Sequence, residues 1–322
     1  ISFGISVSIL QKNKINGLVG DFDCFRYFEL TEEGIPKRFP SLNERNVKIK
    51  SDDFNKIPGS PIVYWVSAKC RKVFTMFNNL GASSTTRKGM ATGLNEEFVR
   101  CWFEVNNNKV GFNLSRQDAT VSQKKWFPYA NGGEYRKWYG NYIDVVNWEN
   151  DGYEMRNTLH PSGKRPISSN YNLEFIFKPL ITWSAISSTA FSARLSLNGA
   201  ICDAGGSACY PSIDNIKELL ALLNSNLTMK NILTMNPTLN FQAGNIAALP
   251  FKILEENQRR IIERMTENCV EISKYDWDSR ETSWDFKANQ LVISNEELVM
   301  EKILDAFDLY TKFWKEKFYE MH

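Results

Sequence analysis

The segment from 234 to 265 separates two kinds of structure in this chain. Turn-forming pairs stand at 236–237 and 244–245, and Pro250 closes the irregular stretch. From Leu254 onward, apolar residues recur at the spacing of one helix face. They are Leu254, Ile261, Ile262, Met265, Cys269 and Ile272. The pattern predicts a folded body that ends near residue 253, followed by a long amphipathic helix.

The body itself is rich in strand and turn signals. Strands are expected where β-branched and aromatic residues gather, at 62–67, 98–105, 142–148, 173–180, 182–186 and 190–195. Short helices are expected at 69–80 and 213–224, the second capped by Ser212 or Asp214. Two long helices, about 254–275 and 295–319, are expected to pack as a pair. The fold class is therefore α+β, with a mixed β-rich domain, flanking helices and a long amphipathic helix pair at the end.

Charge is distributed unevenly along the chain. Residues 254–322 hold 10 Lys and Arg against 16 Asp and Glu, whereas residues 1–253 hold 29 against 21. A basic body with an acidic helical tail fits a polyanionic partner for the body alone. An ordinary solvated surface would also account for this charge. No apolar run approaches the roughly 18 to 20 residues of a membrane span, so no membrane partner is expected.

The sequence lacks the residue patterns that metal binding, base methylation and cofactor binding require. The six cysteines form no C-x-x-C pair and the only histidines are His160 and His322, so no metal site is expected. Unpatterned cysteines fit a reducing cytoplasm. Base methylation would need an Asn-Pro-Pro-aromatic loop, and the nearest stretch is 236–239, NPTL. Neither a nucleotide-binding nor an S-adenosylmethionine-binding glycine loop is evident, so no catalytic or cofactor-binding residue is assigned.

The candidate binding residues lie in three basic clusters. In the first, Arg87 and Lys88 could hold phosphates, and Thr92 and Asn95 could bond phosphates or base edges. A loop that only orders the following element explains this cluster equally well. The second cluster contains Lys124, Lys125, Arg136, Lys137 and Asn141, and the third contains Arg156, Lys164 and Arg165. Arg116, Asn141 and Arg194 are further candidates for base edges.

Long motifs in these regions carry a family resemblance. GMATGLNEEFVRCWFEV, KWFPYANGGEYRKWYGNYIDVVNWENDGYEMR and ITWSAISSTAFSARLSLNGAICDAGGSACYP resemble the target-recognition region of PglX-like adenine-specific DNA methyltransferases of BREX phage-defence systems. IPGSPIVYWVS, NPTLNFQAGNIAALPF and YDWDSRETSWDF resemble its flanking segments. More distantly, the ending at 236–250 followed by a helix is similar to specificity subunits of type I restriction systems.

The resemblance implies a function that the spacing of residues does not. The family transfers a methyl group from S-adenosylmethionine to adenine N6 in a short asymmetric site of double-stranded DNA. It implies that residues 1–60 connect to an N-terminal methyltransferase domain, that 61–253 recognise the target, and that 254–322 are spacer helices. Because the chain starts without Met, we expect it to begin inside a longer polypeptide.

Two other functions stay open at this point. The chain could be a protein-interaction module whose acidic helix pair docks other defence components. It could also be a carbohydrate-binding module, since it has nine Trp and twelve Tyr. Sugar platforms need exposed coplanar aromatic rings, whereas most aromatic residues here alternate with apolar ones.

Overall fold

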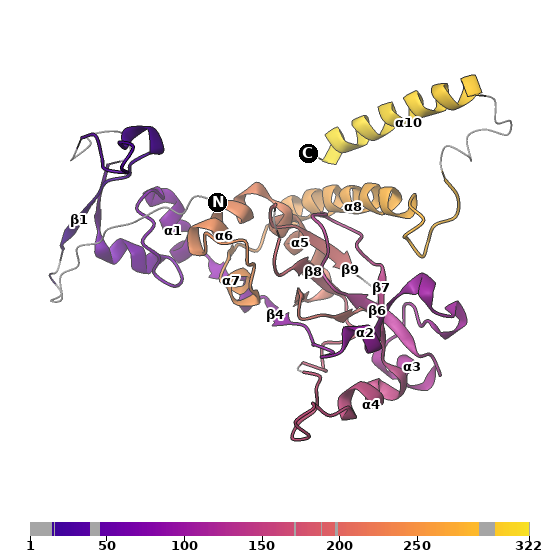
Figure 1. The fold of residues 1–322 in the computed structure, drawn as a ribbon. Helices are drawn as coiled ribbons and strands as arrows, with labels where there is room; N and C mark the ends of the chain where they lie inside the picture. The colour runs from indigo at the N-terminus through magenta and orange to yellow at the C-terminus, as the bar shows by residue number, and fades with distance from the viewer. Residues whose placement is uncertain are drawn as a thin grey trace. The chain divides into compact units, whose positions relative to one another are not determined.

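The computed structural model describes residues 15, 17–38, 46–170, 172–187, 189–196, 199–289 and 300–321 (Figure 1). The chain divides into two compact units, Ile1–Phe77 and Asn78–His322. Helices and short strands occur in both units, which confirms the α+β class. No helix in the described part of the chain is long and apolar enough to cross a membrane. The assignment of roles to 1–60, 61–253 and 254–322 remains a prediction.

The first unit is a small body around one hairpin-like strand pair. Its elements are β1 (Val19–Phe22), η1 (Tyr27–Glu29), β2 (Val47–Lys50), η2 (Ser51–Lys56) and α1 (Ala68–Met76). β1 and β2 pair antiparallel, and the ring of Phe22 stacks on Tyr64 with centroids 4.9 Å apart. The strand expected at 62–67 is wrong, because the segment turns so that Tyr64 can cover Phe22. The helix expected at 69–80 is confirmed as α1 but ends at Met76, since residues 78 and 79 are extended.

The second unit contains two four-stranded sheets. The first has the order β10-β6-β7-β5 and the second has the order β4-β11-β8-β9. The strands of the first sheet are β5 (Val99–Cys101), β6 (Trp126–Ala130), β7 (Asp144–Asn147) and β10 (Ile201–Cys202). Those of the second are β4 (Ser84–Lys88), β8 (Leu180–Ser184), β9 (Ala193–Ser196) and β11 (Gly206–Pro211). All pairs are antiparallel except β10 with β6.

Each sheet has its own core and its own helices. α5 (Ile216–Asn224), α6 (Asn226–Met235) and α7 (Ala243–Ala247) share a buried cluster with β8 and β9. α2 (Asn95–Phe98), α3 (Arg116–Val121) and α4 (Glu149–Asn157) share another with β6 and β7. A third, smaller cluster joins the sheets where β10 leads into β11. A short pair, β3 (Asn78–Asn79) with β12 (Pro250–Phe251), closes the unit.

Serine caps explain where three helices begin. Ser67, Ser115 and Ser225 each accept a hydrogen bond from the backbone N–H three residues on, at the starts of α1, α3 and α6. The helix expected at 213–224 begins as a 3₁₀ turn, η6 (Ile213–Asn215), and continues as α5. Neither Ser212 nor Asp214 caps α5, since its cap residue makes no side-chain hydrogen bond.

Two of the expected strands in the second unit are corrected by the structure. The segment 98–105 holds the end of α2, three residues of β5 and a 3₁₀ helix, η4 (Trp102–Glu104). The segment 173–180 consists of turns, and the strand starts only at Leu180. Positive φ angles at Asn172 (63°) and Phe177 (64°) bend the chain there, which an extended strand does not allow.

The long helices are α8 (Glu256–Asp278) and α10 (Met300–Met321); residues 295–299 of the expected second helix lie outside the described residues. Their expected pairing is confirmed, because the ring of Tyr275 stacks on the buried Trp314 at 5.6 Å. The expected apolar face of α8 is partly wrong. Ile261 and Met265 are 54% and 59% exposed, while Thr266, Ser273 and Trp277 are buried. α8 packs against α5 (Figure 1), and the Ser273 hydroxyl contacts the carbonyls of Lys137 and Tyr139 at 3.0 Å.

Candidate nucleic-acid interface

The edge strand β4 presents two cations to solvent. It lies at the end of its sheet, where Arg87 pairs with Ala208 and Lys88 with Ser207 of β11. Both basic side chains are exposed, and the described residues show no ion pair for either. Exposed cations without carboxylate partners are suited to phosphate oxygens.

An aromatic ring lies between Arg87 and a second cation. The guanidinium of Arg87 is 5.5 Å from the centre of the Phe175 ring, and the Lys178 amine is 5.3 Å from it. Tyr210 of β11 packs against the same ring at 4.9 Å. Phe175 and Lys178 were missed from the sequence, because their segment reads as a buried strand. The pattern of an aromatic followed by Lys and Pro at 177–179 was the only hint of a surface turn.

The third basic cluster is a hairpin built by its own backbone. Ile167 donates to the Thr158 carbonyl at 2.9 Å, His160 to that of Arg165 at 2.9 Å, and Gly163 to that of His160 at 2.7 Å. Gly163 has a φ of 67°, which a residue with a side chain rarely adopts. Lys164 and Arg165 are exposed at the tip of this hairpin.

Backbone contacts join these three segments into one surface. Ala91 and Ser169 exchange two N–H···O bonds of 3.0 and 2.8 Å, which fix the hairpin beside the chain that leaves β4. The Asn172 side chain donates to the Lys88 carbonyl at 3.4 Å. Gly93 lies so close that a Cβ there would be 2.5 Å from the Ile167 oxygen. We call this set the basic face; its members are the exposed cations Arg87, Lys88, Lys164, Arg165 and Lys178 and the half-buried Phe175.

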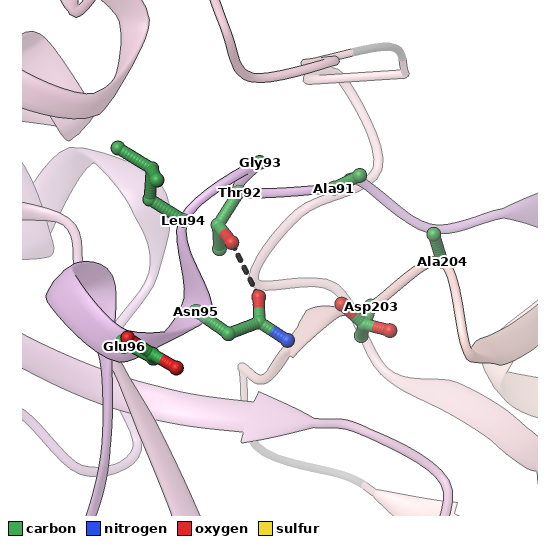
Figure 2. A pocket seen from close by; sticks show the side chains of 8 residues that line it. All are labelled: Ala91, Thr92, Gly93, Leu94, Asn95, Glu96, Asp203 and Ala204. Atoms are coloured by element: carbon green, nitrogen blue, oxygen red, sulfur yellow. Dashed lines mark hydrogen bonds between the residues drawn. The ribbon is translucent and has the colours of Figure 1, made fainter.

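A pocket of about 570 Å³ opens within the segment that joins β4 to the first sheet (Figure 2). Its lining residues are Ala91, Thr92, Gly93, Leu94, Asn95, Glu96, Asp203 and Ala204. The buried Thr92 hydroxyl donates to the Asn95 side-chain oxygen, as Figure 2 shows. Thr92 therefore positions Asn95 and does not itself face a partner, whereas Asn95 is exposed.

Asp203 is held rigidly at the junction of the two sheets. One carboxylate oxygen accepts from the Tyr129 hydroxyl and the other from the Gly205 N–H. Burial, with Asp203 as a further cause, raises the pKa of Tyr129, so its hydroxyl stays protonated and donates. Each carboxylate oxygen keeps a second lone pair for another donor.

Arg116 is engaged in the structure and does not face a partner. Its guanidinium makes a bidentate pair with Asp151 at 2.9 and 2.8 Å and donates to the Leu173 carbonyl at 2.9 Å. It thereby ties α3 to α4. Arg156 contacts the same carboxylate at 3.1 Å but remains exposed. This arrangement removes Arg116 from the candidate base-reading residues.

Lys124 and Lys125 are half-buried just before β6. The Lys124 amine donates to the Asn108 carbonyl at 2.6 Å, and the Lys125 amine lies 5.7 Å from the centre of its neighbour's ring, Trp126. No described contact joins them to the basic face. They remain candidates for peripheral phosphate contacts.

Two further candidates of the second cluster bind helices of the same unit, Arg136 binding α8 and Lys137 binding the end of α5. Arg136 pairs with Asp276 at 2.7 Å, and both side chains are only 14% exposed. It also donates to the carbonyls of Tyr139 and Ser273 at 2.7 and 2.8 Å. The Lys137 amine donates to the Asn224 carbonyl at 2.9 Å, and burial lowers the pKa of Lys137.

Arg194 and Asn141 donate hydrogen bonds to carbonyls of the loop between β6 and β7, which we call the anchor loop (131–143). The fully buried Arg194 donates to the carbonyls of Arg136 and Gly132 at 3.4 and 3.2 Å, and burial lowers its pKa to about 10. Asn141 donates to the carbonyls of Gly132 and Glu134. The expectation that Arg136, Lys137, Asn141 and Arg194 face a partner is therefore corrected.

The physical reason lies in the backbone of the anchor loop. Positive φ angles occur at Gly132, Gly133, Trp138, Gly140 and Asn141. The loop folds back on itself, so its carbonyls turn inward and need donors. Arg136, Asn141 and Arg194 supply those donors, and the same residue types would bind phosphates on an exposed loop. Among the described residues, no group of three or more His, Cys, Asp or Glu could hold a metal ion.

The chain has relatives among adenine-specific methyltransferases, although no known protein-family profile matches it. It is 36% identical over 291 residues to the adenine-specific methyltransferase PglX of Lacticaseibacillus casei (strain Zhang), covering 88% of this chain and 24% of that protein. It is also 36% identical over 273 residues to the adenine-specific methyltransferase BrxX of Escherichia coli O9:H4 (strain HS), covering 83% of this chain and 21% of that protein.

The chain is thus a homologue of one segment of the PglX and BrxX adenine-specific methyltransferases. It spans less than a quarter of the length of these relatives, 24% and 21%. The resemblance to PglX-like adenine-specific methyltransferases is confirmed, whereas the target-recognition role of the matched segment stays a prediction.

Proposed function

We propose that this chain is the DNA target-recognition part of an adenine-N6-specific methyltransferase in a BREX-type phage-defence system. The observation that supports it most is the basic face. Four exposed cations that have no carboxylate partner among the described residues, Arg87, Lys88, Lys164 and Arg165, lie on an edge strand and a hairpin that backbone bonds join. The relatives are named adenine-specific methyltransferases, and the family resemblance of the sequence motifs makes DNA the expected polyanion.

In this proposal the residues have different tasks. Arg87, Lys88, Lys164, Arg165 and Lys178 contact phosphates, and Phe175 holds two of these cations in place. Lys124, Lys125 and Arg156 are peripheral contacts. Asn95 reads a base edge, and Arg116, Arg136, Lys137, Asn141 and Arg194 only support the fold.

The chemistry of methyl transfer is assigned to the rest of the parent protein. S-adenosylmethionine would bind there, in an N-terminal methyltransferase domain that is the natural partner of this chain. The relatives extend far beyond the matched segment, which leaves room for such a domain. The cytoplasm, where host and phage DNA meet, is the expected location.

Binding to duplexes tests the proposal. The chain would be titrated against a fluorescein-labelled duplex of arbitrary sequence and, separately, against the labelled single strand of the same sequence. Fluorescence anisotropy would measure binding. We expect micromolar or tighter binding to the duplex at low salt, and weaker binding as salt rises. Absence of duplex binding at about 50 mM salt would contradict the proposal.

A second candidate function has its own observation. The helix pair exposes large apolar side chains, namely Ile261, Met265, Phe307, Leu309 and Tyr319. Exposed apolar residues on an otherwise acidic helix pair are typical of protein interfaces. On this alternative the pair docks other components of the defence system.

The alternative has a separable test. Ile261→Ser and Met265→Ser would be introduced together, and association with each protein of the same defence system measured by analytical ultracentrifugation. Loss of one association with unchanged duplex binding supports the docking role. Equal association of wild type and variant with every component would remove it.

A further inference from the structure

We infer that the pocket between residues 91–96 and Asp203 reads one base of the target through its exocyclic amino group, with adenine preferred. The inference rests on the proposed function, because it requires a duplex on the basic face. It adds the chemistry of the base that is read and names the residues that read it.

The pocket lies on the segment that connects Lys88 of the basic face to α2 and is bonded to the base of the hairpin. The segment 89–96 runs directly from Lys88 to α2, and Ala91 in its middle is bonded to Ser169 at the base of the hairpin. Phosphates held by Lys88 on one side and Lys164 on the other would place a groove of the duplex over this segment. A pocket at that point meets base edges.

The negatively charged lining of the pocket repels phosphate and attracts hydrogen-bond donors. Glu96 and Asp203 bring two carboxylates to an otherwise basic surface. In the major groove, adenine and cytosine present an amino group, while guanine and thymine present oxygen at the equivalent position. Carboxylate oxygens accept from the amino groups and are repelled by the oxygens, so the pocket discriminates in favour of adenine and cytosine.

Asn95 distinguishes adenine from cytosine. Its side-chain oxygen accepts from Thr92, so its amide nitrogen is the donor available to a ligand. Adenine has an acceptor, N7, beside its N6 amino group, whereas cytosine has none at that place. A donor from Asn95 and an acceptor from Glu96 or Asp203 together match the adenine edge.

The pocket is rigid enough to select. Asp203 is fixed by Tyr129 and by the Gly205 N–H, and only 7% of it is exposed. The backbone of Asp203 is also closely packed, because a Cβ at Gly89 would lie 2.2 Å from the Asp203 carbonyl oxygen. Groups held in place before binding lose little entropy when the base arrives.

Selection from a randomised duplex pool, followed by sequencing, tests the inference. The wild-type chain should enrich a motif that contains one strongly preferred adenine. Asn95→Ala and Glu96→Gln should each weaken that preference by about tenfold, with guanine or thymine tolerated in Glu96→Gln. Affinity for a duplex that lacks the motif should change less than twofold.

Glu97→Gln is the matched control. Glu97 is the exposed neighbour of Glu96 on α2 and does not line the pocket, so this variant should keep the wild-type motif. Thermal unfolding of each variant shows whether the fold is intact, and Asp203→Asn serves as a second test of the acceptor wall if Asn95→Ala unfolds.

The outcomes separate the two proposals. A motif that the folded Asn95, Glu96 and Asp203 variants all retain overturns the inference and leaves the proposed function standing. Equal binding of the wild type to all duplexes overturns the inference and the recognition role together. Absence of any duplex binding overturns both.

Discussion

The basic face and the anchor loop contain the same residue types but use them in opposite ways. On the basic face Arg87, Lys88, Lys164 and Arg165 are exposed and lack carboxylate partners among the described residues. In the anchor loop Arg136 is paired with Asp276 and bonded to two carbonyls. The difference teaches that backbone geometry, rather than residue type, decides whether a cation is available to a polyanion.

The cost of desolvation explains this division. A charge that leaves water needs a partner of opposite charge or several hydrogen bonds. Arg136 has both, and the fully buried Arg194 has two carbonyls and a pKa lowered to about 10. The cations of the basic face keep their water, which they can exchange for phosphate oxygens when DNA binds.

The largest expected effect is on the stability of the anchor. Arg136→Ala leaves Asp276 without its buried partner and removes two further hydrogen bonds, so we expect a loss of about 3 kcal/mol in the free energy of unfolding. Urea denaturation measures it. Arg280→Ala is the matched control, because Arg280 meets the same carboxylate at 3.0 Å but is 53% exposed. Its loss should stay below about 1 kcal/mol; equal losses would contradict the buried role of Arg136.

The next effect is on duplex binding. Arg87→Ala with Lys88→Ala should lower the slope of log K against log salt by about two, since two phosphate contacts are lost. The melting temperature should change little, because both side chains are exposed. Lys230→Ala with Lys252→Ala removes the same charge from exposed positions elsewhere in the second unit and should leave the slope unchanged. A similar drop in the control would mean that net charge alone drives binding.

A smaller effect is expected at the aromatic ring. Phe175→Leu removes the surface on which Arg87 and Lys178 lie at 5.5 and 5.3 Å. Each such contact at an exposed site is worth about 0.5–1 kcal/mol, so duplex affinity should fall about two- to fivefold with the salt slope unchanged. Anisotropy titrations at two salt concentrations measure both quantities. A changed slope of log K against log salt would show that Phe175 alters the number of phosphate contacts and not the orientation of the cations that make them.

The smallest effect concerns pH. Burial is the main cause that raises the pKa of Asp144, a β7 residue that accepts from Asn131 at the start of the anchor loop. Ionisation of this carboxyl therefore opposes folding. The protonated carboxyl makes its full contribution to the free energy of unfolding below its unfolded pKa of about 3.9, and this contribution is lost as pH rises through its pKa in the folded protein. Asp144→Asn should flatten the fall in melting temperature between about pH 4 and 6. An unchanged pH profile would show that Asp144 is solvated in solution.

Helices with a regular apolar repeat were predictable from the sequence, whereas segments whose conformation depends on tertiary contacts were not. Helical periodicity located α1, α5, α8 and α10, and the described parts of the long helices pack as expected. The apolar face of α8 was misjudged, because Ser273 and Thr266 are the residues that pack closely against the body. The strand signal at 62–67 failed because Tyr64 packs on Phe22, which is far earlier in the chain.

The candidate site shows the same limit. Arg87, Lys88, Lys164 and Arg165 are exposed where the sequence placed them, and their contact with DNA stays a prediction. The sequence could not distinguish the anchor-loop cations from these exposed ones, because residue types do not show which way the backbone carbonyls point. Phe175 and Lys178 were missed because an aromatic residue in an apolar run indicates core. The turns at Asn172 and Phe177 instead leave Phe175 half-buried and Lys178 exposed.

The salt dependence of duplex binding tests the central claim most directly. The wild-type chain and a variant with Arg87, Lys88, Lys164 and Arg165 all replaced by Ala would be titrated with one duplex between about 50 and 200 mM salt. The account predicts that the slope of log K against log salt falls by about four in the variant while the unfolding midpoint stays the same. An unchanged slope in a folded variant would contradict the basic face as the site where DNA binds.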